Sequence, residues 1–374
     1  MKKEKKHLFF VDNLRILLIV LVILHHLAIT YGGPGMWYYQ ESSPGMIESL
    51  VFALFLAMNQ SFFMGFFFMI SGYFTPGSYD RKGAWRFFKD RLLRLGIPLL
   101  FYIIFIDIAI NYATAISRGF SGSFLEFIGL YIEGYAGLGT GPLWFVESLL
   151  IFAAIYVLWR LLSKSTYKVG RMPNNKKIAI FALFLAIFTF IVRIWLPLGW
   201  NFELLNLQIP FFPQYIILFI VGLIAYRGKW FSQIPAKTGK LWLRVAIVLA
   251  ILLPIMLVSG APDGDPSVFF GGVSWQAFAY PLWEQFFAVS IIIALSVLFR
   301  ERYNHQGRLA KELSASAYAV YILHAPIIVF LALSLKGIAL NPLLKFVLVA
   351  PVAVFLCFLI GNYIRKLPLA RKIL

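Results

Sequence analysis

The chain has 374 residues, of which 61% are hydrophobic, 18% aromatic and 13% charged, and its formal net charge is +18. Soluble domains are about 45–50% apolar and about 25% charged, so this composition excludes a soluble globular protein and predicts an integral membrane protein. The basic residues form short clusters between apolar runs, which argues against nucleic-acid binding, and the single cysteine, Cys357, excludes both an intrachain disulfide and a metal site built from several cysteines.

Ten apolar segments are long enough, or nearly so, to cross about 30 Å of hydrocarbon as helices. The first follows a basic N-terminus without a small-residue cleavage site, so we expect an uncleaved span rather than a signal peptide. The second is too long for one straight crossing. The sequence therefore predicts an all-α integral membrane protein with about ten transmembrane helices, at residues 14–31, 46–75, 95–116, 142–162, 178–198, 212–227, 241–260, 274–299, 313–335 and 343–363.

The charges between these spans predict the topology. With both termini placed in the cytoplasm, 29 of the 34 lysines and arginines fall on the cytoplasmic side, as expected for a multi-pass protein of the cell membrane. The basic, amphipathic segment 81–95 is typical of a helix at the cytoplasmic interface. The glycine-rich segment 118–141 is expected to form an outer loop with a short surface helix. We expect one membrane domain over residues 1–374, without an appended soluble domain.

Ionisable residues inside a membrane are costly, so they are candidates for function. Arg15 and His26 are eleven residues apart, which places them within about 20° of the same helix face and roughly 16 Å apart along the axis. A span starting near residue 14 would put Arg15 in the first helical turn, with Asp12 close enough to offset its charge. His25 points about 80° away from this face. A neutral imidazole is the usual general base, so His26 is a candidate for that role, with a packed histidine as the structural alternative. For Arg15 the structural alternative is a cytoplasmic anchor.

With these residues the chain resembles the family-3 membrane acyltransferases, over nearly its whole length. Their first-helix signature is an arginine, ten intervening residues and a histidine, matched by Arg15 and His26, and their R-x-x-R is matched by Arg91 and Arg94 in DRLLRLGIP. Further matches are FFFMISGYF around Ser71-Gly72, GPLWFVESLL around Trp144, and SASAYAVYILHAP, which contains His324. Each motif alone is weak, but five in family order are specific. The standalone, glucan-modifying members are the most similar type.

The resemblance implies an O-acyltransferase of the bacterial plasma membrane that modifies polysaccharides of the cell envelope. It would move an acyl group, as in O-acetylation, from cytoplasmic acyl-CoA to a hydroxyl of an extracytoplasmic carbohydrate. His26 would be the general base, and Arg15 would stabilise developing negative charge or orient the donor; an acyl-histidine intermediate is the alternative to direct transfer. Arg91 and Arg94 would bind the phosphates of coenzyme A, unless they are only interface anchors.

Other residues are expected to line the acceptor side of the cavity: Trp144, Glu147, Ser71, Tyr321 and His324. Structural roles compete for several of them, namely an aromatic belt for Trp144, helix packing for Ser71-Gly72, and hydrogen bonding for Tyr321 and His324. We expect no metal and no tightly bound cofactor. The expected partners are acyl-CoA, a carbohydrate acceptor and membrane lipid. Two other functions fit a polar cavity in a membrane: a transporter or flippase for a glycan or an acylated product, and a non-catalytic membrane sensor.

Overall fold

The computed structural model describes residues 7–41, 44–134, 139–163, 171–261 and 264–373. These residues fold into helices without a β-strand, and nine helical stretches among them are long and apolar enough to cross a membrane, which confirms the predicted all-α membrane fold. The longer elements are α1 (Phe9–Thr30), α2 (Met46–Arg91), α4 (Ile108–Ser117), α5 (Phe124–Gly134), α6 (Trp144–Leu162), α7 (Asn175–Trp195), α8 (Phe212–Gly228), α10 (Ala236–Gly260), α11 (Trp275–Arg302), α12 (Arg308–Ser334) and α13 (Pro342–Ile364).

The second and third predicted spans lie in one helical stretch, Met46–Ser117, of 72 residues. At about 1.5 Å per residue it would be roughly 110 Å long if straight, more than three times the hydrocarbon thickness. The helical backbone is interrupted at Gly83, with φ 75° and ψ 170°, so two crossings meet at this glycine. Beyond it, two segments are wound as π-helix, η1 (Leu92–Gly96) and η2 (Tyr102–Asp107), separated by α3 (Ile97–Phe101). Such segments inside helices are frequent at functional sites.

The helices α2 and α8 pack unusually closely, and glycine makes this possible. A Cβ atom on Gly72 would lie 2.2 Å from the carbonyl oxygen of Phe219, and one on Gly222 would lie 2.1 Å from that of Met69. Small residues allow membrane helices to approach in this way. Gly72 therefore has the helix-packing role that was one of the two interpretations of the Ser71-Gly72 pair.

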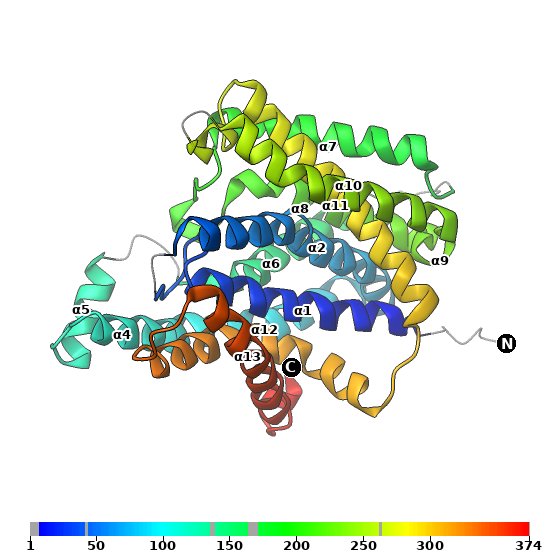
Figure 1. Ribbon diagram of the computed structural model, residues 1–374. Coiled ribbons are helices and arrows are strands. Elements are labelled where there is room, and N and C mark those ends of the chain that lie inside the picture. Colours follow the sequence, from blue (N-terminus) through cyan, green and yellow to red (C-terminus); the bar gives the residue numbers. More distant parts are fainter. Residues whose placement is uncertain (1–6, 42–43, 135–138, 164–170, 262–263, 374) are drawn as a thin grey trace.

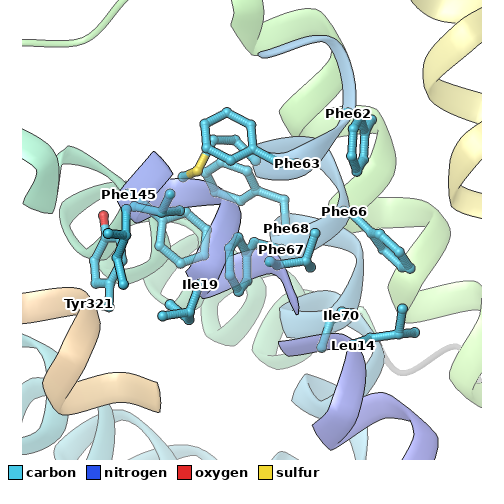
Figure 2. Close-up of a cluster of buried hydrophobic side chains, with 14 of the residues drawn as sticks. Leu14, Ile19, Phe62, Phe63, Phe66, Phe67, Phe68, Ile70, Phe145 and Tyr321 are labelled. Atoms are coloured by element: carbon cyan, nitrogen blue, oxygen red, sulfur yellow. The ribbon is translucent and has the colours of Figure 1, made fainter. Parts of the chain in front are cut away.

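The centre of the bundle is filled with aromatic and aliphatic side chains from four helices. A run of phenylalanines in α2 points in several directions, and α2 packs against α1 and α6 (Figure 2). The ring centroid of Phe68 lies 4.7 Å from that of Phe145 in α6. The centroid of Phe145 lies 5.8 Å from that of Tyr321 in α12. The helices α1 and α12 pack against each other, and Figure 1 shows α12 below α1.

The basic ends of several helices gather at one end of the bundle. Asp80 in α2 forms ion pairs with Arg160 of α6, at 3.2 Å, and with Arg227 of α8, at 2.7 Å. At the same end Asn13 of α1 donates hydrogen bonds to the backbone carbonyls of Tyr303 and His305. The helix α5, in the predicted outer loop, lies far from the N-terminal end of α1 (Figure 1). That the basic end faces the cytoplasm remains a prediction from charge.

Cysteine labelling tests this orientation. After Cys357 is replaced by serine, a cysteine introduced as Lys237→Cys should be shielded from an impermeant thiol reagent in intact cells, whereas Pro266→Cys should react. Both positions are exposed in the structure. Lysed cells are the control, because both cysteines should then react. Cysteines placed at 165–175 should likewise be shielded, and those placed at 262–266 should react. Parts of both ranges lie outside the described residues. Labelling in the opposite pattern would invert the topology.

Candidate functional site

Two histidines from opposite ends of the chain meet inside the bundle. His26 of α1 and His324 of α12 are hydrogen-bonded, with 3.2 Å between Nδ1 of His26 and Nε2 of His324. The Nδ1 atom of His324 lies 2.6 Å from the backbone carbonyl oxygen of Tyr321. His324 is fully buried, whereas His26 is partly accessible. The sequence placed both residues in one cavity but did not predict that they touch.

These contacts determine which nitrogen of His26 can act as a base. A carbonyl oxygen only accepts, so Nδ1 of His324 carries the hydrogen that is donated to Tyr321. In a neutral pair, Nε2 of His324 then has a lone pair and accepts the N–H of His26 Nδ1. In this tautomer Nε2 of His26 carries the lone pair, and the backbone carbonyl of Val22 is a second acceptor beside the ring. The carbonyl of Tyr321 thus favours one tautomer of each ring, and the hydrogen bond from His324 orients the ring of His26.

The neighbouring His25 is in a different environment, as the helical geometry predicts. It is 8% exposed and its ring stacks on Phe63 at 5.0 Å. The side-chain amide of Asn59 donates a hydrogen bond to Nδ1 of His25 at 3.3 Å, and also donates to the carbonyl of Leu21. His25 therefore joins α1 to α2 and does not belong to the His26–His324 pair.

A tryptophan that the sequence did not single out covers His26. Trp37 lies in the loop between α1 and α2, and its ring stacks on His26 with 4.0 Å between centroids and 18° between planes. Its Nε1 atom is buried and has no hydrogen-bond partner among the described residues. The sequence showed only that this loop is aromatic, and the three-dimensional fold is needed to bring Trp37 to the histidine.

The residue after Trp37 anchors this loop. The hydroxyl of Tyr38 donates to Oδ1 of Asp107 at 2.5 Å and lies 3.0 Å from the hydroxyl of Tyr102. Asp107 is 2% exposed and also accepts hydrogen bonds from Tyr131 and from Asn111. Tyr102 and Asp107 are the two ends of the π-helical segment η2. We call Tyr38, Tyr102 and Asp107 the loop anchor; it holds Trp37 in place at the end of the bundle away from the basic helix ends.

At the basic end, Arg15 comes together with the two arginines predicted to bind the donor, Arg91 and Arg94. Arg91 lies within electrostatic range of both Arg94 and Arg15. Arg91 also lies over the ring of Phe87, and the hydroxyl of Tyr318 donates to the backbone carbonyl of Arg94 at 2.6 Å. We call Arg15, Arg91 and Arg94 the arginine cluster. Because Tyr318 and His324 are both in α12, this helix contacts the cluster at one level and His26 at another.

The prediction that Arg15 occupies the first helical turn is wrong. The helix starts at Phe9, because the apolar Phe9 and Phe10 extend it before the polar residues, so Arg15 lies in the second turn. Its side chain is 48% exposed and is 3.4 Å from Asp12, the partner expected from the sequence. About 16 Å of helix separate it from His26, more than its side chain can span. Of its two predicted roles, orienting the donor fits this position, and stabilising charge beside His26 does not.

The remaining predicted cavity residues lie in α2, α6 and α12. The ring of Trp144 stacks on Tyr215 at 5.5 Å, and the hydroxyl of Tyr321 donates to the carbonyl of Pro142, two residues before Trp144. Glu147 is 7% exposed, and its Oε2 atom has no hydrogen-bond partner among the described residues. The backbone carbonyl of Ser71 accepts a hydrogen bond from Thr75, which is a contact within the helix.

A second polar group in the bundle explains two charges that the sequence left unassigned. Arg193 of α7 and Glu284 of α11 form an ion pair at 2.9 Å, with side chains 1% and 3% exposed. Gln285 donates to Glu284, and Gln214 of α8 donates both to Gln285 and to the carbonyl of Ser61 in α2. This network connects four helices away from the two histidines, so its role is structural.

The chain is similar in sequence to known proteins. The family model described as an acyltransferase domain matches residues 8–362. Two similar curated proteins are both named "Glucans biosynthesis protein C": that of Escherichia coli O81 (strain ED1a) is 25% identical, and that of Shigella dysenteriae serotype 1 (strain Sd197) is 26% identical. Each alignment covers 262 residues, 65% of this chain and 65% of the relative. No solved structure matches the chain significantly.

Proposed function

Because the chain belongs to the acyltransferase family whose domain it matches over residues 8–362, we propose that it transfers an acyl group from cytoplasmic acyl-CoA to a hydroxyl of a carbohydrate. One observation carries the proposal. Arg15 of the arginine cluster and His26 lie at two levels of the same helix, α1, about 16 Å apart, and α12 contacts both the cluster and His26. A long donor with phosphates at one end and a thioester at the other matches this spacing of charge and base.

The chemistry assigns each group one task. The Nε2 atom of His26 accepts the proton of the acceptor hydroxyl while the hydroxyl oxygen attacks the carbonyl carbon of the thioester. The carbon–sulfur bond then breaks, coenzyme A leaves as the thiolate, and the proton held by His26 passes to it. The products are the ester and free coenzyme A. His324 stabilises the protonated His26 by accepting the hydrogen bond from Nδ1.

A carbohydrate acceptor has two supports. The relatives are named for glucan biosynthesis, and an aromatic and an acidic side chain, Trp144 and Glu147, stand in the first turn of α6. Sugars stack on aromatic faces such as Trp144, and a carboxylate such as that of Glu147 accepts hydrogen bonds from hydroxyls. We place the acceptor there, with O-acetylation of an envelope glucan as the reaction expected.

The direct test uses purified protein in lipid nanodiscs. Acetyl-CoA should be converted to free coenzyme A, measured with a thiol reagent, at a rate that rises when a glucan is added, and mass spectrometry should show the acylated product. A flippase or a sensor would release no thiol. An absence of both thiol and acylated glucan, with folded protein and acyl-CoAs of several lengths, would overturn the proposal.

The arginine cluster gives a prediction about the donor. Arg91→Ala and Arg94→Ala should raise the KM for acyl-CoA and change kcat little, because phosphate contacts are equal in the ground state and the transition state. Lysine should restore only part of the affinity, because it cannot form the bidentate contact. Arg15→Ala should impair turnover, and Arg15→Lys less so. Arg244→Ala, at an exposed position in α10, is the control for lost charge. Unchanged donor kinetics in both alanine variants would leave Arg91 and Arg94 as membrane anchors.

A further inference from the structure

The proposed reaction requires a group that none of the predicted residues supplies. When a hydroxyl attacks a thioester, negative charge develops on the carbonyl oxygen, and hydrogen-bond donors aimed at that oxygen are usually the largest single contribution to the rate. Arg15 lies roughly 16 Å from His26 along α1. Both ring nitrogens of His324 already form hydrogen bonds, to the carbonyl of Tyr321 and to His26. A donor to this oxygen therefore has to come from another residue near His26.

Trp37 has the necessary properties. Its ring stacks on that of His26 with 4.0 Å between centroids, so a group bound at this imidazole lies within reach of the indole. Its Nε1–H is a donor only, and it is buried without a partner among the described residues. A buried donor that is left unpaired is destabilising, and a ligand able to accept its hydrogen bond would remove that cost.

We propose that Trp37 is a further catalytic residue, whose indole N–H donates a hydrogen bond to the acyl carbonyl oxygen as this oxygen becomes negative. The inference rests on the function proposed above. It deepens that function by assigning the charge-stabilising role to the outer loop, on the acceptor side, and not to Arg15. In the step itself, the carbonyl oxygen gains the electron pair of the C=O π bond, accepts the Trp37 hydrogen bond, and returns the pair when the carbon–sulfur bond breaks.

The carbonyl oxygen is a better partner for Trp37 than the acceptor hydroxyl. The attacking hydroxyl gives its proton to His26 and needs its lone pair for the new bond, so accepting a hydrogen bond from tryptophan would weaken it as a nucleophile. The carbonyl oxygen has no hydrogen of its own and gains charge only in the transition state. A donor fixed in advance for that oxygen lowers the barrier without holding the ground state more tightly.

The loop anchor explains how a loop residue can be fixed so well. Tyr38, directly after Trp37, is held by Asp107 and Tyr102, and Arg118 donates to the carbonyl of Tyr38 at 3.2 Å. Preorganised donors are effective because they do not have to reorient during the reaction. Tyr38→Phe should therefore lower kcat through Trp37, by less than loss of the indole N–H itself, and should have little further effect once that N–H has been removed.

The decisive experiment replaces Trp37 with β-(3-benzothienyl)alanine, which has the shape of tryptophan but sulfur in place of the N–H. We expect kcat to fall about 10²–10³-fold, the range for one such donor, with unchanged KM for acetyl-CoA and unchanged thermal stability. Trp37→Phe should behave similarly. Trp195→Phe, at an exposed position at the end of α7, is the matched control and should keep full activity.

The outcomes separate this inference from the function on which it rests. If the benzothienyl variant keeps full kcat while His26→Ala is inactive, the role of Trp37 is overturned and the acyltransferase function stands. A higher KM for the glucan with unchanged kcat would also overturn it, and would make Trp37 an acceptor-binding residue. If the unmodified protein releases no coenzyme A under any condition, the proposed function itself fails.

Discussion

His26→Ala should lower acyl transfer at least about 10²-fold, because general base catalysis typically contributes about 10²–10⁴ to the rate. His26 carries the only ring nitrogen of the pair that is free to accept a proton, since the His324 nitrogens are bonded to Tyr321 and to His26 itself. Expression and membrane insertion should be normal, because His26 is partly accessible and is not part of the buried core. His26→Gln should lose as much, as glutamine fills a similar volume but is not a base.

His25→Ala is the control for this result. His25 is buried against Phe63 and bonded to Asn59, so its loss should reduce thermal stability while activity per folded molecule falls much less. The rate of the unmodified protein should also rise with pH and level off once the imidazole is neutral. Near-normal acylation by well-folded His26→Ala protein would end the mechanism described above, and the transporter interpretation would then lead.

The features predicted well from the sequence are those that depend on local pattern. Long apolar runs and positive clusters predict membrane helices, because neither depends on distant contacts. The spacing of Arg15 and His26 is fixed by helix geometry, so their levels in the membrane and the separate position of His25 follow from residue counting. The close approach of α2 and α8 at Gly72 was likewise one of the interpretations that the Ser71-Gly72 pair allowed.

The features that the sequence did not predict depend on the tertiary fold. His26 and His324 are separated by 298 residues, and no periodicity shows that α1 and α12 cross at this level. Trp37 reaches His26 because Tyr38 is held by Asp107, a contact between a loop and a π-helical segment. The positions of these side chains depend on hydrogen bonds from the loop and on the extra residue in the π-helical turn. Counting residues along a regular α-helix predicts neither. The pairing of Arg193 with Glu284 was open for the same reason.

That ion pair gives the prediction with the largest effect on stability. Arg193→Met should destabilise the protein by about 3–5 kcal/mol, because it leaves the carboxylate of Glu284 buried and without its counter-charge. The two side chains are 1% and 3% exposed, and only Gln285 would still donate to the carboxylate. The change should appear as a much lower unfolding temperature of the purified protein in detergent, with the His26 site itself unaltered.

Two further variants make this result specific to a buried charge. The double variant Arg193→Met/Glu284→Gln removes both charges and should recover most of the loss, since replacing a complete buried pair is often close to neutral. Lys82→Met breaks the exposed pair with Asp90, whose side chains are 38% and 42% exposed, and should cost at most about 1 kcal/mol. If Arg193→Met costs no more than Lys82→Met, the Arg193–Glu284 pair is solvated by water within the bundle, and the polar network around it is open rather than structural.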